Sequence, residues 1–179
     1  FDVRMDYRKE RTIVTSRYSF SDRRLFEPFA GPGFSIVPGY GNDAPRRAQS
    51  FVVSATTQTG SRFLNEARAA WTRVAAGVFQ EGQGTSINQQ VGLPDLSSDP
   101  RDWGLSLINV AGYSSLGHEY NNPQDGRTNH WQLADTVSWT TGRHLVRFGG
   151  EVRLLSQEAF RDVQSRGLLT FTSAAFTGN

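Results

Sequence analysis

The chain has 179 residues, of which 37% are hydrophobic and 12% aromatic, and its 19 basic and 17 acidic side chains give a formal net charge of +2. It contains no cysteine, which excludes a disulfide framework and a thiolate metal site. The charges are spread along the chain, which argues against a nucleic acid partner. No apolar run is long enough for a membrane-spanning helix.

Period-two alternation of apolar and polar residues predicts β-strands through most of the chain. Residues 1–8 show it most clearly, with apolar side chains at odd positions and charged ones at even positions. Residues 12–21 continue it after a turn, although Ile13 breaks the pattern. Residues 48–57 are rich in β-forming side chains, but their mixed order leaves open which face is apolar.

A strand is also expected at 62–74, where Asn65 interrupts an apolar row. An amphipathic helix is the rival over 64–76, because this stretch is rich in alanine and has helical spacings. Gly60 before it and Gly77 after it favour the strand, since both are turn residues.

Two further strands are expected near the end of the chain. In residues 130–139, Asp135 lies on the apolar side, a position that is costly in the middle of a bilayer and cheap near its edge. After Gly142, the apolar face carries Val146, Phe148, Val152 and Leu154, and the polar face carries Arg147, Gly149, Glu151 and Arg153.

The connections between these strands alternate between tight and long. The tight ones lie at 8–11, 58–62 and 140–143. The long ones cover 23–47 and 75–129, with a medium one near 157–166. Short turns at one end and long loops at the other are typical of outer-membrane β-barrels.

The aromatic residues favour the same fold. Trp139 lies beside a tight turn, whereas Tyr18, Phe20, Trp71 and Trp131 lie at the opposite strand ends, which matches two girdles at the membrane interfaces. We therefore predict an all-β chain, an antiparallel up-and-down transmembrane β-barrel segment of about seven strands with short periplasmic turns and long extracellular loops. Alternation alone would also fit a soluble β-sandwich.

Four stretches, in order, resemble TonB-dependent outer-membrane receptors, particularly the Oar-like transporters that carry a carboxypeptidase-regulatory-like domain. Residues 17–22 are similar to the RYSF-x-D strand of that family, and 65–68 to its NE-x-R strand. Residues 135–153 resemble its D-x-x-SW-x-x-G-x-H…FGGE-x-R hairpin, and 167–179 its G-x-x-x-F…F-TGN stretch.

This resemblance implies a plugged barrel of roughly 22 strands in the outer membrane of a Gram-negative bacterium, of which residues 1–179 would be a part. The plug and the N-terminal and C-terminal parts of such a receptor are not expected within these residues. It further implies active import of a scarce solute, such as a siderophore, carbohydrate or peptide. The implied partners are outer-membrane lipid, the receptor's own plug domain, TonB and the extracellular solute.

Ligand contacts are expected in the long loop at 75–129. Its stacking and hydrogen-bonding candidates are Trp103, Tyr113, His118, Tyr120 and Arg127. The alternative is that these residues pack the loop against its neighbours. The loop at 23–47 is rich in proline and glycine, which predicts turns without regular structure, able to cover the barrel mouth.

No catalytic, cofactor or metal site is expected. His118, His130 and His144 lack partners at metal-ligand spacing, and the chain has no G-x-S-x-G motif. Asp95, Asp99 and Asp102 lack the spacing of a calcium loop. Besides a transporter, the sequence leaves open a passive outer-membrane channel or adhesin, and a soluble secreted all-β carbohydrate-binding module.

Overall fold

A computed structural model of the chain describes residues 1–29 and 35–172. It divides into two compact units, each built from three segments. The first, here called the wall unit, consists of Phe1–Asp22, Arg47–Ala75 and Arg127–Glu158. The second, here called the loop unit, contains the described residues of 23–46, 76–126 and 159–179.

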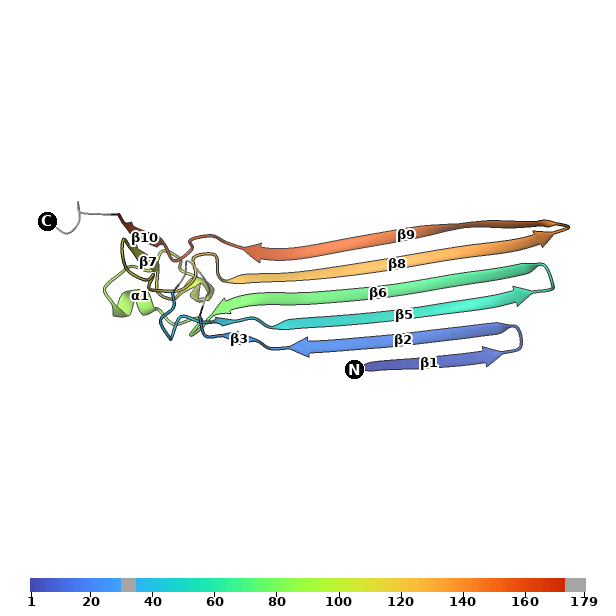
Figure 1. The fold of residues 1–179 in the computed structure, drawn as a ribbon, viewed down its shortest axis with the longest axis horizontal. Coiled ribbons are helices and arrows are strands. Elements are labelled where there is room, and N and C mark those ends of the chain that lie inside the picture. The colour runs from blue at the N-terminus through green and yellow to red at the C-terminus, as the bar shows by residue number, and fades with distance from the viewer. Residues whose placement is uncertain (30–34, 173–179) are drawn as a thin grey trace. The chain divides into compact units, whose positions relative to one another are not determined.

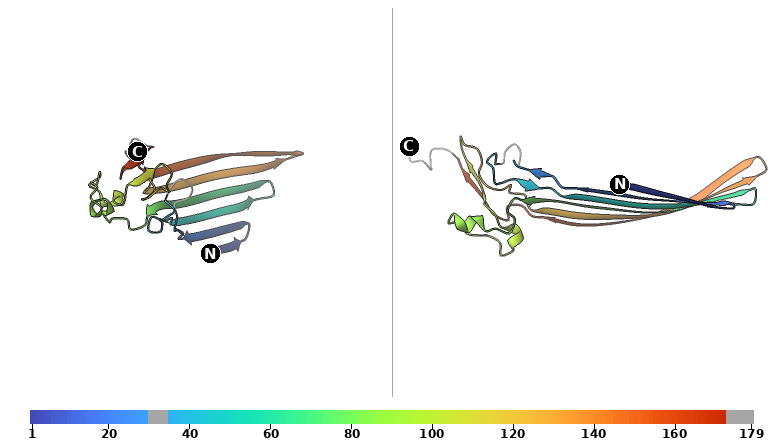
Figure 2. Two further views of the ribbon diagram at one scale, coloured as in Figure 1. Left: turned by 60° about the vertical axis from the view of Figure 1, so that its left-hand side comes forward. Right: turned by 90° about the horizontal axis from the view of Figure 1, so that it is seen from below.

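The wall unit is built on six long strands. They are β1 (Asp2–Lys9), β2 (Thr12–Arg23), β5 (Arg46–Thr59), β6 (Phe63–Gln80), β8 (Gln124–Thr141) and β9 (His144–Arg161). The strands pair in the order β1-β2-β5-β6-β8-β9, so neighbours in the sheet are successive long strands of the chain (Figure 1). They form one twisted layer, as Figure 2 shows, and in the described residues this sheet is open, with β1 and β9 at its edges. The predicted antiparallel up-and-down fold is confirmed.

The three predicted tight turns are confirmed. They join β1 to β2, β5 to β6 and β8 to β9. Each contains a residue with positive φ, namely Glu10 (48°), Gly60 (63°) and Gly142 (57°). Glycine adopts this conformation without steric cost, which explains why two of the three turns carry it.

The register of β1 and β2 separates two faces of the wall. Val3 lies opposite Tyr18 and Tyr7 opposite Val14. Directly opposed residues share a face, so the apolar rows of the two strands lie together and the charged rows lie together. Ile13 lies opposite Arg8. The residue that breaks the alternation is therefore an apolar side chain on the charged face, beside the turn.

The sequence leaves open which face of β5 is apolar, and the contacts of this strand identify it. Gln49 donates a hydrogen bond of 2.8 Å to the Tyr18 hydroxyl, which lies on the apolar face of β2. Phe51, Val53 and Ala55 share the parity of Gln49 and therefore this face.

The segment with a rival helical pattern is a strand. β6 runs continuously to Gln80, further than predicted, and β8 begins as early as Gln124. Neighbours on both sides supply β6 with ladder partners, and this tertiary pairing overrides the helix propensity of its alanines. The second long loop is accordingly shorter than expected.

The loop unit contains short elements. They are β3 (Phe26–Glu27), β4 (Asn42–Asp43), α1 (Ile87–Gln90), a 3-10 turn (Pro100–Asp102), β7 (Leu107–Val110) and β10 (Leu168–Phe171). β4 pairs with β3 and with the end of β6, where Asn42 lies opposite Gln80. The prediction of a first long loop without regular structure is wrong at β3 and β4. Its Gly31, Pro32 and Gly33 lie outside the described residues.

The last described strand does not join the wall. β10 pairs in parallel with β7, in a two-stranded sheet of the loop unit. The described residues thus hold six wall strands rather than about seven. The terminal stretch Phe176, Thr177, Gly178 and Asn179 lies outside them.

Candidate functional site

The apolar face of the wall is unusually exposed. Met5, Leu133 and Val152 are 68%, 61% and 60% exposed. No second layer of the wall unit covers them. A contiguous exposed apolar surface of this kind marks a site of contact with a membrane or with another protein. Alternating apolar and polar faces with the apolar face turned outward is the design of a transmembrane barrel wall.

Aromatic pairs mark both ends of this face. Phe63 stacks on Trp139 at the turn end, with ring centroids 6.0 Å apart, and Trp71 contacts Trp131 at the loop end, at 5.8 Å. In each strand the two aromatic positions are eight residues apart, about 26 Å of strand at roughly 3.3 Å per residue. Strand tilt shortens this span across the membrane, so the pairs fit the two interfaces of a bilayer.

The two polar residues that lie between these aromatic pairs on the apolar face of β6 and β8 contact each other. Asn65 Nδ2 donates a hydrogen bond of 2.7 Å to Asp135 Oδ1. Asp135 is four residues from Trp131 and four from Trp139, so it lies midway between the aromatic pairs and not near an edge. The hydrogen bond offsets part of the cost of placing a carboxyl group there.

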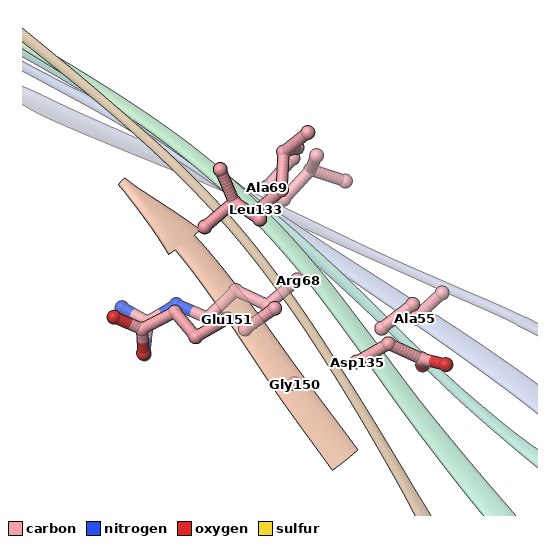
Figure 3. Close-up of a pocket in the computed structure, with 11 residues that line it drawn as sticks. Ala55, Arg68, Ala69, Leu133, Asp135, Gly150 and Glu151 are labelled. Atoms are coloured by element: carbon pink, nitrogen blue, oxygen red, sulfur yellow. The ribbon is translucent and has the colours of Figure 1, made fainter. Parts of the chain in front are cut away.

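The other face of the wall is charged and internally paired. Arg147 Nη2 lies 3.5 Å from Glu66 Oε2, and its Nε donates to Ser138 Oγ at 3.2 Å. Figure 3 shows Arg68 and Glu151 together on this side of the strands, and Ala69 and Leu133 on the other. In a barrel this face lines the lumen, where charged side chains stay hydrated.

His118, one of the predicted ligand contacts, is fully buried in the loop unit. The Leu105 N–H donates to its Nδ1 at 3.0 Å, so Nε2 carries the proton and donates to the Glu81 carbonyl oxygen, also at 3.0 Å. Burial first, and then the charge of Arg166, lower the pKa of His118 to about 4. The ring is therefore neutral at pH 7 and ties two loop segments together.

Arg166 is a buried cation of the loop unit, and no pattern in the sequence singles it out. Its Nη2 donates to the Glu119 carbonyl oxygen at 2.6 Å, and Nη1 to the Asp102 carbonyl oxygen at 3.4 Å. Burial lowers its pKa to about 10, and the charges of Asp102 and Glu119 oppose that shift. The guanidinium remains charged at pH 7 and links the last segment of the loop unit to two points of residues 76–126.

Amides complete this polar interior. Asn42 Nδ2 donates to Glu119 Oε2 at 2.9 Å, and Asn122 Nδ2 donates to Asn42 Oδ1 at 2.8 Å. Asn88 accepts from the Ser106 N–H at 2.8 Å. These residues join the first long loop to the second and hold the loop unit in one conformation.

The other predicted ligand contacts differ in their burial and in the unit to which they belong. Trp103 is half-buried, and its Nε1 donates to the Ser97 carbonyl oxygen at 3.0 Å. Tyr120 is also half-buried, whereas Tyr113 is 80% exposed. Arg127 belongs to β8 in the wall unit, 4.0 Å from Glu158. Tyr113 is thus the most accessible of the candidates.

Among the residues that the structure describes, no group of three or more histidine, cysteine or acidic side chains could hold a metal ion. The three loop aspartates bind protein groups. Asp95 accepts from Ser86 and Gln89, Asp99 caps the 3-10 turn, and Asp102 accepts from Ser97. Over the same part of the chain, no helix is both long and apolar enough to cross a membrane.

An open antiparallel sheet with one lipid-facing and one charged face, tight turns and long loops defines a wall segment of a transmembrane β-barrel. The chain belongs to the outer membrane beta barrel domain family, whose profile matches residues 1–179. It is accordingly an outer-membrane protein. No curated protein and no solved structure matches it significantly.

Proposed function

We propose that the chain forms part of the wall and loops of a TonB-dependent transporter that imports a scarce solute across the outer membrane of a Gram-negative bacterium. The observation that carries the proposal is the folded loop unit. Its buried Arg166, His118 and amide side chains fix segments from three parts of the chain. A preordered surface loses less conformational entropy when it binds a dilute solute. A pore for passive diffusion does not need such a preordered binding surface. The resemblance of four ordered stretches to TonB-dependent receptors supports the same function.

In this mechanism the wall and the loops have separate tasks. The wall satisfies its backbone hydrogen bonds within the sheet, because an unsatisfied group in lipid costs several kcal/mol. The loops, with Tyr113 the most exposed of the candidate contacts, capture a siderophore, carbohydrate, peptide or similar solute. Energy from the inner membrane, delivered through TonB, then loosens the plug domain. We propose uptake without chemical change of the solute, and therefore no enzyme activity.

Ion conductance of the full-length protein separates this function from a passive channel. In a planar lipid bilayer with KCl on both sides, a plugged transporter should give no stable open steps. Steady open steps in the absence of denaturant would identify a passive channel instead.

Direct binding tests the energised step. The purified periplasmic domain of TonB should bind the full-length protein saturably in detergent, and a TonB domain with a scrambled strand should not. Absence of saturable binding would refute TonB dependence and leave an adhesin or channel as the function.

A further inference from the structure

The lipid-facing side of the wall changes from aromatic to basic at its loop end. Arg73 lies two residues after Trp71, so strand alternation puts it on the same face. By the same rule Arg47 shares the face of Phe51, and Arg127 that of Trp131. The guanidinium of Arg47 indeed lies over the Phe20 ring, 5.7 Å from its centroid.

These arginines differ in their partners. Arg47 pairs with Asp22 at 3.2 Å, and Arg127 lies 4.0 Å from Glu158. The Arg73 side chain has no ion pair or hydrogen bond within the described part of the chain. It is a cation at the membrane boundary whose charge no carboxylate neutralises there.

Amide side chains flank Arg73 on both neighbouring strands. The Ser50 hydroxyl lies 3.4 Å from that of Thr72, which puts Gln49 beside Arg73 on β5. Asn129 precedes Trp131 by two residues, and Trp131 contacts Trp71, so Asn129 lies beside Arg73 on β8. The surroundings of Arg73 thus offer hydrogen-bond donors to an anion.

Next to Arg73, toward the membrane interior, the same face is hollowed. An apolar depression of about 310 Å³ is lined by Phe51, Ala69, Trp71, Trp131, Leu133 and Leu154. The small side chain of Ala69 leaves room between larger neighbours. A second depression follows it toward the tight turns, lined in part by Ala55, Ala67 and Gly150 (Figure 3).

We propose that this face binds a phosphate-bearing lipid of the outer leaflet, with a phosphate on Arg73 and an acyl chain in the depression. Charge complementarity selects the headgroup: the boundary cations are all arginines, whose fork of N–H donors matches a phosphate. The loop end of a barrel lies at the outer surface, so the lipid comes from the outer leaflet. Its acyl chain would cover the exposed side chains of Leu133 and Leu154.

Lipid retention measured by native mass spectrometry tests the proposal. The full-length protein, purified and delipidated in detergent, is titrated with bis-phosphorylated lipid A. Arg73→Ala should weaken lipid A binding by about tenfold or more, since a charge-assisted hydrogen bond is lost. The matched control is Arg68→Ala, which removes the same charge from the same strand on the lumen face and should bind as the parent does.

Two further arms test the headgroup and the groove. Dephosphorylated lipid A should bind the parent protein as weakly as lipid A binds Arg73→Ala. Ala69→Trp, which fills the depression, should also reduce lipid A binding while leaving the gel mobility of the folded barrel unchanged. Equal binding by the Arg73 and Arg68 variants, or equal binding of intact and dephosphorylated lipid A to the parent protein, would overturn the proposal.

Discussion

The wall unit and the loop unit place their apolar and polar side chains in opposite ways. The wall exposes large apolar residues such as Leu133 and Leu154. The loop unit buries polar ones, and its fully buried side chains include His118, Gln80 and Asn88. The wall therefore depends on lipid for its apolar face, whereas the loop unit depends on specific hydrogen bonds. The same kind of substitution should have different consequences in the two units.

An arginine on the lipid-facing side should have the largest effect. Leu133→Arg places a cation between Trp131 and the middle of the apolar face, and should destabilise the assembled barrel by up to about 4 kcal/mol, the upper cost of an arginine at the bilayer midplane. Urea unfolding of the full-length protein in lipid vesicles measures this change. Ala134→Arg, on the charged face of the same strand, is the control and should cost far less. Equal losses would show that the faces are wrongly assigned.

Acidification should affect the loop unit selectively. The pKa of His118 is about 4 in the folded chain and about 6.5 when unfolded, so the unfolded state binds more protons between these values. The contribution of the neutral ring is complete above pH 6.5 and declines as the pH falls toward 4, by about 3 kcal/mol in total.

Hydrogen exchange of the backbone amides measures this decline in the full-length protein. Leu105 and its neighbours should lose protection between pH 6.5 and 4, while amides of β8 in the wall should not. His118→Gln should remove that difference, because glutamine does not titrate. A parent protein whose loop protection is constant over this range would contradict the buried neutral ring.

Adjacent glycines of β9 should differ in what they tolerate. A Cβ atom on Gly149 would overlap the backbone of β8 at Asp135 and Thr136, whereas one on Gly150 would meet nothing within 4 Å. Gly149→Val should therefore cost about 1 to 3 kcal/mol through strain, and Gly150→Val only a fraction of that. Gel mobility of heated and unheated samples reports the folded fraction of each variant. Equal yields would mean that β8 and β9 are further apart than described.

Much of the wall was predictable because its physics is local. Alternation depends on adjacent residues, and a tight turn depends on residues such as Gly60 and Gly142, so both can be recognised in a linear sequence. The interior of the loop unit was not predictable in this way. Arg166 contacts Glu119 and Asp102, which are distant in sequence, and no periodicity links them. Those contacts exist only after two distant segments of the chain have met.

Even in the wall, one feature depended on contacts between strands. Asn65 and Asp135 look like independent defects of two alternating patterns, but they form one hydrogen-bonded pair. Asn65→Leu should leave the Asp135 carboxyl group without its partner on the lipid-facing side. We expect a loss of about 1 to 2 kcal/mol in urea unfolding of the full-length barrel in vesicles.

A double variant of Asn65 and Asp135 tests whether the unpaired carboxyl group causes that loss of stability. Asn65→Leu combined with Asp135→Leu replaces both polar groups by apolar ones, which lipid solvates well, so the double variant should recover the stability lost in the single one. If the two changes were simply additive, with each costing free energy, then the pair would face water or protein rather than lipid. The wall would then resemble the loop unit at this position, with a polar contact that stabilises the fold by itself.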